Sequence, residues 1–203
     1  MAQFAAESGR AATPAATGAN PAPLGLSGFA LTTFVLSTIN AGWFPAASAE
    51  VVVALALFYG GLAQFMAGMW EFRAGNTFGA TAFSSFGAFW LSYAAILIPG
   101  TGIVAGLGSA LHSALGIYLL AWAIFTFLMF LGTFRLNVAL MALFGFLTLT
   151  FLFLALGELI GSGFALIGGY LGIITALIAW YTALAGVLSA HNGIFSLPVW
   201  PRT

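Results

Sequence analysis

The polarity of the chain is organised as six long apolar stretches separated by short polar links. Each stretch is about as long as the roughly 20 residues that a helix needs to cross the hydrocarbon core of a membrane. The stretches are apolar throughout and do not alternate with a period of two, which argues against a transmembrane β-barrel. The pattern predicts an all-α integral membrane protein with six transmembrane helices. The predicted spans are residues 24–42, 51–70, 79–98, 114–134, 138–157 and 164–188.

The two ends of the chain differ from this membrane domain, which we place at residues 20–190. Residues 1–19 are rich in Ala, Thr, Gly and Pro and contain Glu7 and Arg10. This composition predicts a disordered cytoplasmic tail. The tail has no apolar core of the signal-peptide type, so we expect no cleaved signal. Residues 191–203 are expected to form a second cytoplasmic tail.

Charged residues make up only 4% of the 203 residues, whereas soluble domains contain about 25%. This scarcity agrees with a surface that is mostly covered by lipid. With six spans, all four arginines fall on one side of the membrane, while Glu50 and Glu158 fall on the other. The positive-inside rule then predicts a multi-pass protein of the cell membrane with both termini in the cytoplasm. The arginines are Arg10, Arg73, Arg135 and Arg202.

The missing residue types exclude several kinds of chemistry. The chain has no Lys, Asp or Cys, which excludes a Schiff base, an aspartyl phosphate and a thiolate nucleophile. His112 and His191 match no metalloprotease spacing, and no phosphate-binding GxxxxGK[ST] motif is present. No basic patch indicates a nucleic-acid partner. We therefore expect a protein that is not an enzyme, with no cofactor and no metal site.

The interiors of the spans contain almost no ionisable group, although proton relays and ion pumps depend on such groups. We therefore expect an uncharged pathway lined by small, hydroxyl, amide and aromatic side chains. Helical spacing places candidate lining residues in stripes on four of the spans. The candidates are Phe29, Thr33, Ser37 and Asn40 on the first span, Gln64 and Glu71 on the second, Phe86, Trp90 and Tyr93 on the third, and Leu143, Leu147 and Thr150 on the fifth.

The same residues also have a purely structural interpretation. Thr and Ser hydroxyls bond to carbonyls of their own helix, and aromatic side chains fill the core of a bundle. An amide in the middle of a span needs a partner, so helix–helix contact and pore lining are both open for Gln64. His112 in the outer loop between spans three and four, and His191 after span six, are candidates for pH sensing or inert surface residues.

The approach to the first span, NPAPLGL at residues 20–26, is the most distinctive stretch. Its two prolines stiffen the chain and remove hydrogen-bond donors. Asn20 can accept a hydrogen bond from the backbone just after it. The helix that follows offers free N–H groups and a partial positive charge, which favour an anion. A rigid helix start without a ligand explains the same composition.

Four motifs together resemble the acetate uptake transporter family, which includes bacterial succinate–acetate permeases and yeast acetate transporters. The motifs are NPAPLGLSGF, FYGGLAQFMAG, GNTFGATAFSSFGAFWLSYA and FLMFLGTFR. The resemblance extends over residues 20–188. It implies a cytoplasmic N-terminus and six transmembrane helices around a pore in each protomer, with the protomers assembled as a ring-shaped homohexamer. It also implies transport of acetate and related short carboxylates, succinate among them.

The family narrows its pore with a hydrophobic constriction of Phe, Tyr and Leu. Matching the motifs residue by residue, the resemblance implies that Phe29 and Leu147 occupy two of these positions. The third is Phe86, where the family motif has Tyr. This departure removes a phenol hydroxyl and with it a hydrogen bond to a passing carboxylate, so a change in selectivity or rate is expected.

Several alternatives stay open at this stage. Transport could be that of an anion channel or of a proton-linked carrier. A urea or amide channel is also compatible with an uncharged pore. A structural or sensory membrane protein would show no solute flux at all. Export of ammonium, proposed for yeast relatives, finds no support because the spans contain no pore His or Asp.

Overall fold

The computed structural model describes residues 18–190 and 195–202, and within them six helical rods are long and apolar enough to cross a membrane. The protein is therefore a multi-pass membrane protein, as the apolar pattern predicts. The rods are Ala22–Asn40, Ala46–Ala74, Thr77–Leu97, Ile103–Arg135, Val138–Leu159 and Ser162–Ala190. The α-helices are α1 (Ala22–Asn40), α2 (Glu50–Leu57), α3 (Gln64–Ala74), α4 (Thr77–Leu97), α5 (Ile103–Leu107), α6 (Leu111–Gly132), α7 (Val138–Leu159) and α8 (Ser162–Ala190). The shorter helical turns are η2 (Ala46–Ala49), η3 (Phe58–Ala63), η4 (Pro99–Thr101), η5 (Gly108–Ala110) and η6 (Thr133–Arg135).

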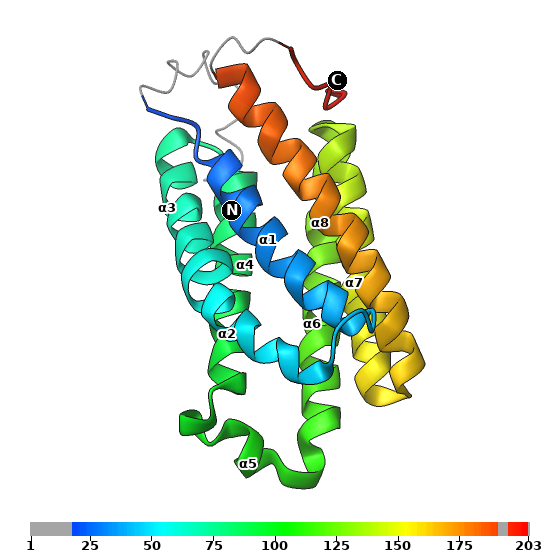
Figure 1. Ribbon diagram of the computed structural model, residues 1–203. Helices are drawn as coiled ribbons and strands as arrows, with labels where there is room; N and C mark the ends of the chain where they lie inside the picture. Colours follow the sequence, from blue (N-terminus) through cyan, green and yellow to red (C-terminus); the bar gives the residue numbers. More distant parts are fainter. Residues whose placement is uncertain (1–17, 191–194, 203) are drawn as a thin grey trace, which may run out of the picture.

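Successive rods run in opposite directions and enclose a central axis (Figure 1). They pack in the cyclic order α1, α2–α3, α4, α6, α7, α8 and back to α1. The contact between α4 and α6 is the weakest of the ring. Aromatic side chains such as Phe89, Tyr118 and Trp122 lie between these two helices and close the ring there. The axis of this ring is where a pathway through the protomer would run.

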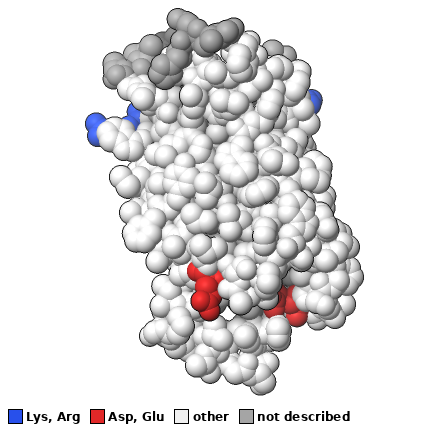
Figure 2. Space-filling view, viewed as in Figure 1, with Lys and Arg blue, Asp and Glu red and all other residues white. Residues whose placement is uncertain are grey.

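The two ends of the bundle carry opposite charge. We call the end where α1 begins and α8 ends the terminal end, and the end that holds α5 the far end (Figure 1). Among the described residues, Arg73, Arg135 and Arg202 lie at the terminal end, whereas Glu50 and Glu158 lie at the far end. On the face drawn in Figure 2 the basic side chains likewise lie toward the terminal end and the acidic ones toward the far end. Arg10, the rest of residues 1–17, and His191 fall outside the described residues.

The segment between α4 and α6 differs from the expected loop. It contains the short helices η4, α5 and η5, and α6 begins at Leu111. Gly102 and Gly108 have positive φ angles of 70° and 48°, a conformation that glycine adopts without a steric penalty. These two residues break the segment into short turns. His112 consequently lies in the first turn of α6, and its expected position in a loop was wrong.

The second rod is interrupted by the π-helical turn η3, which contains the FYGG motif. Here α1 and η3 approach closely, because a Cβ atom at Gly60 would lie 2.6 Å from the hydroxyl oxygen of Thr32. A Cβ atom at Gly28 would lie 2.6 Å from the carbonyl oxygen of Tyr59. The wider turn ends directly before Gln64, the first residue of α3, whose side chain is buried.

Candidate substrate pathway

A cavity of about 290 Å³ lies inside the ring at the terminal end. Residues of α1, α3, α4, α7 and α8 line it, together with two residues of the C-terminal segment. Most of the lining side chains are apolar. The polar groups are three asparagines, Gln64, Thr182 and Ser189. No acidic or basic side chain is among the described lining residues.

The three asparagines stand at the starts of α1, α4 and α7, and each accepts a hydrogen bond from its own helix. Asn20 Oδ1 accepts from the N–H of Ala22 at 3.0 Å. Asn76 Oδ1 accepts from Gly79 at 3.0 Å, and Asn137 Oδ1 accepts from Leu140 at 2.8 Å. Asn76 and Asn137 are therefore N-caps, while the cap position of α1 is Pro21.

Three helix N-termini thus face one cavity. Each N-terminus carries roughly half a positive charge from the aligned peptide dipoles. Anions bind at such ends because the first N–H groups have no partner within the helix. The C-terminal turn of α8, at Gly186 and Ser189, also borders the cavity and opposes this field. Three positive ends against one negative end leave a region that favours a carboxylate.

The inner end of the cavity is formed by Phe29, Phe86 and Leu147, the three residues predicted to form the constriction. Their exposed fractions are only 4%, 2% and 2%. The ring centroids of Phe29 and Phe86 are 5.9 Å apart. Phe86 also packs against Phe144 and Phe151, at 6.0 and 6.3 Å. The inner end of the cavity is therefore lined by apolar side chains from α1, α4 and α7.

Among the buried polar residues, Gln64 has the properties expected of a ligand-binding residue. It lines the cavity, its exposed fraction is 1%, and its Oε1 atom has no hydrogen-bond partner among the described residues. A buried amide without a partner costs free energy of about 1–3 kcal/mol. The side-chain amide of Gln64 can donate two hydrogen bonds and accept others. A solute that carries an O–H or N–H donor, such as the neutral form of a carboxylic acid, can satisfy the Gln64 Oε1 atom.

Glu71 is also buried but lies behind the cavity wall. A Cβ atom at Gly79 would lie 2.9 Å from the carboxyl carbon of Glu71 and close to the Asn76 side chain. Asn76 is in turn a hydrogen-bond partner of this carboxyl group. Glu71 therefore supports the cap at the start of α4, and the wall of the cavity stands between it and a solute.

Of the remaining candidates, Leu143 lines the cavity and the others lie outside it. Thr33 is buried in α1 and Asn40 is the last residue of α1, at the far end. Thr150 donates to the carbonyl of Phe146 at 2.8 Å, the structural alternative for a hydroxyl in a helix. Ser37 packs against Gly172 of α8, where a Cβ atom would collide with its hydroxyl.

Beyond Phe86 an aromatic cluster fills the axis toward the far end. The ring of Phe89 packs against Trp122 and Phe151, with centroid distances of 5.1 Å each. Tyr93 stacks on Phe89 at 6.1 Å, and the Tyr118 hydroxyl lies 2.7 Å from Ser92 Oγ. A solute that leaves the cavity in this direction must displace these rings.

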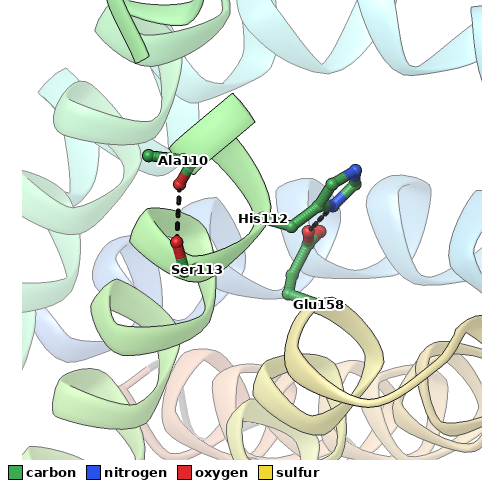
Figure 3. A network of polar contacts seen from close by, with 4 residues as sticks. All are labelled: Ala110, His112, Ser113 and Glu158. Carbon is green, nitrogen blue, oxygen red and sulfur yellow. Dashed lines mark hydrogen bonds and ion pairs between the residues drawn. The ribbon is translucent and has the colours of Figure 1, made fainter. Parts of the chain in front are cut away.

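At the far end, His112 of α6 and Glu158 of α7 face each other (Figure 3). The Nδ1 atom of His112 lies 2.7 Å from Oε2 of Glu158. The side chains are 78% and 29% exposed, and exposed pairs of this kind contribute about 0–1 kcal/mol to stability. The pair therefore contributes little to the stability of the fold.

Comparison with known proteins decides the family. The model of the GPR1/FUN34/yaaH family matches residues 3–202. The chain belongs to this family. The resemblance to acetate uptake transporters is thereby confirmed, since the family includes relatives named for acetate transport.

Three relatives and one solved structure are similar to the chain over most of its length. The chain is 46% identical over 202 residues to acetate permease A of Emericella nidulans, covering 89% of this chain and 65% of the relative. It is 42% identical over 183 residues to the succinate-acetate/proton symporter SatP of Escherichia coli, covering 89% of this chain and 95% of the relative. It is 49% identical to ammonia transport outward protein 2 of Saccharomyces cerevisiae, covering 94% of this chain and 71% of the relative. The structure of the bacterial acetate channel SatP matches with a TM-score of 0.79 and 37% identity, covering 90% of this chain and 99% of that chain.

The sequence analysis did not identify Asn76, Asn137, Leu197 and Val199 as lining residues. A signal for the asparagines was present, because Asn immediately before an apolar helix is a typical cap. Asn20, Asn76 and Asn137 stand just before the first, third and fifth spans, which all start on the same side of the membrane. No comparable signal exists for Leu197 and Val199, which the chain's path brings back to the cavity.

Proposed function

We propose that this protein transports acetate and related short carboxylates, including succinate, across the membrane. The observation that carries the proposal is the cavity, where three helix N-termini and the Gln64 amide face an apolar interior. A short carboxylate has a polar end that suits the helix starts and an alkyl end that suits the apolar walls. Its oxygens are attracted by the helix dipoles and accept hydrogen bonds from side-chain amides at the helix starts, and its alkyl part contacts the apolar walls. Relatives named for acetate and succinate–acetate transport support the same substrate class.

Transport proceeds through the constriction of Phe29, Phe86 and Leu147. A bare anion between apolar side chains is costly because nothing replaces its water shell. We therefore propose that the carboxylate crosses this point together with a proton, so that the species at the narrowest point is neutral. The alternative is an anion that keeps part of its hydration shell, as in a channel.

We further propose that the terminal end faces the cytoplasm and that the protein resides in the cell membrane. The positive-inside rule supports this orientation, because Arg73, Arg135 and Arg202 share that end. Six protomers are proposed to form a ring, as the family resemblance implies, with a separate pathway in each protomer. Native mass spectrometry of the protein extracted in detergent tests the hexamer.

Export of ammonia is the second candidate, because one relative is named for it. The field at the cavity opposes this function for the ammonium ion, since helix N-termini repel cations. A urea channel would gain nothing from these helix ends, because urea carries no charge. Both solutes serve as controls for the carboxylate proposal.

The test is counterflow in proteoliposomes that contain the purified protein. Labelled acetate is expected to accumulate against unlabelled acetate, whereas labelled urea and methylammonium are expected to match empty liposomes. Phe29→Ala and Leu147→Ala are expected to change acetate flux. Leu149→Ala, at a position that is 42% exposed and outside the cavity, serves as the control and should not. Acetate flux equal to that of empty liposomes in every variant would show that transport is the wrong class of function.

A further inference from the structure

The C-terminal segment at residues 195–202, here called the C-terminal strap, is fastened to the start of α7. The N–H of Val138 donates to the carbonyl of Trp200 at 3.0 Å, and the N–H of Ala139 donates to Val199 at 3.3 Å. The N–H of Arg202 donates to the carbonyl of Leu136 at 3.0 Å. These bonds form an antiparallel pairing centred on the bridge between Asn137 and Pro201.

The strap is also fastened to α8. The hydroxyl of Tyr181 donates to the carbonyl of Pro198 at 2.7 Å. The rings of Tyr181 and Trp200 stack with centroids 6.4 Å apart and planes inclined by 11°. Since α7 and α8 are neighbours in the ring, the strap links these two helices at the terminal end.

The backbone of Trp200 is held in a strained conformation. Its φ angle is +51°, the only positive φ of a non-glycine residue among the described residues. A side chain in the left-handed region is disfavoured and persists only where surrounding contacts determine it. The bond from Val138 and the stacking on Tyr181 are such contacts.

The strap directs alternate side chains inward. Leu197 and Val199 line the cavity and are half-buried, whereas Pro198 and Trp200 are exposed. The same cavity is lined by Asn20 and Asn137 at two of its helix starts. Two branched apolar side chains therefore stand beside the polar groups that would receive the carboxylate.

The strap also decides which donors of α7 a carboxylate can reach. The first two N–H groups of α7, those of Val138 and Ala139, are bonded to strap carbonyls. The third, that of Leu140, is bonded to the side chain of Asn137. A solute can therefore interact with the dipole of α7 and with the amide of Asn137. The first backbone N–H groups of α7 are already bonded to the strap and to Asn137.

We propose that Leu197 and Val199 determine the size of the carboxylate that this protein transports, and that Tyr181 is the positioning residue that holds them at the cavity. This inference rests on the proposed function of carboxylate transport. Acetate passes beside the two side chains, whereas each added methylene of a longer carboxylate competes with them for the same space, so four-carbon solutes such as succinate and butyrate pass more slowly than acetate. A pocket of this kind discriminates by about tenfold or more for one methylene group.

The experiment compares uptake of labelled acetate and labelled butyrate into proteoliposomes. In the double variant Leu197→Ala/Val199→Ala, the ratio of butyrate to acetate uptake is expected to rise by about fivefold or more. Val199→Phe is expected to lower the same ratio, because it narrows the cavity. Tyr181→Phe removes the bond to Pro198 and keeps the ring, so a smaller rise is expected. Leu184→Ala, at an α8 residue that is 47% exposed and outside the cavity, is the control and should leave the ratio unchanged.

The outcomes separate the two proposals. Acetate uptake by the unmodified protein equal to that of empty liposomes would overturn the proposed function itself. If the unmodified protein takes up acetate but the ratio of butyrate to acetate uptake is the same in all folded variants, the proposed role of the strap is wrong. A strap that only caps α7 would lower uptake of both solutes equally and lower thermal stability, which also counts against the inference. If the double variant fails to fold, the other two variants still test the proposal. Val199→Phe is expected to lower the ratio of butyrate to acetate uptake, and Tyr181→Phe is expected to raise it.

Discussion

Phe86 joins the cavity to the aromatic cluster, because its ring contacts Phe29 on one side and Phe151 on the other. The position could be found from the sequence, since the third span repeats a family motif in which Tyr is expected there. Phe29 and Leu147 could be found in the same way. What the residue pattern could not give is the direction of each side chain, and for this reason Thr33 and Thr150 were expected in the pathway and lie outside the cavity.

Restoring the family hydroxyl with Phe86→Tyr is expected to raise the initial rate of acetate uptake by about two- to tenfold. The added hydroxyl can donate to the carboxylate at the constriction, and one net hydrogen bond contributes about 0.5–1.5 kcal/mol. Phe125→Tyr is the matched control, because Phe125 contacts Phe86 at 5.6 Å without lining the cavity. A folded Phe86→Tyr protein with an unchanged or lower rate would contradict the assignment.

Asn137→Asp tests whether the helix starts attract an anion. Asp caps a helix as well as Asn does, so thermal stability should change little. The new negative charge should repel a carboxylate in the cavity and lower acetate uptake by about tenfold. Asn40→Asp makes the same chemical change at the far end of α1 and should have a smaller effect. Equal effects of the two variants would show that the N-terminus of α7 has no special role.

At the scale of elements, the six rods were predicted correctly because lipid imposes a length and an apolar composition that are visible in the sequence. The interruption of the second rod by η3 was not predicted. Hydropathy does not register a change from α- to π-helical hydrogen bonding, and the glycines of FYGG indicate only that small residues are needed. The short helices at residues 99–110 were missed because their glycines and proline are equally typical of a loop.

Gly60→Ala is expected to destabilise the protein by about 1–3 kcal/mol, because the added methyl group would overlap Thr32 and push η3 away from α1. Gln64 would move with η3, so acetate uptake should fall as well. The measurements are thermal denaturation in detergent and uptake in liposomes. Gly106→Ala is the control, since no atom lies within 4 Å of a Cβ there and α5 tolerates alanine. Equal melting temperatures of the two variants would argue against a tight contact at Gly60.

At the scale of the whole molecule, the separation of charge fixes the expected orientation. The chain contains no Cys, so single cysteines can be introduced without background. Ser109→Cys, at the exposed far end, should react with an impermeant maleimide in intact cells. Ala74→Cys, exposed at the terminal end, should react only after permeabilisation. The reverse pattern would place the terminal end outside and overturn the positive-inside assignment.

The whole pathway also determines whether transport carries charge. Helix ends at the cavity attract a carboxylate as an anion, but the constriction and the aromatic cluster beyond it offer no charge to replace its water. Under the proposal that a proton crosses with the carboxylate, lowering the external pH from neutral to mildly acidic should raise uptake, because the neutral acid becomes more abundant. Flux should also proceed without an acetate-dependent current across a planar bilayer containing the purified protein.

A current that reverses at the equilibrium potential of acetate, with uptake insensitive to pH, would instead establish a hydrated anion as the transported species. The rings beyond Phe86 would then have to move apart far enough to admit its water shell.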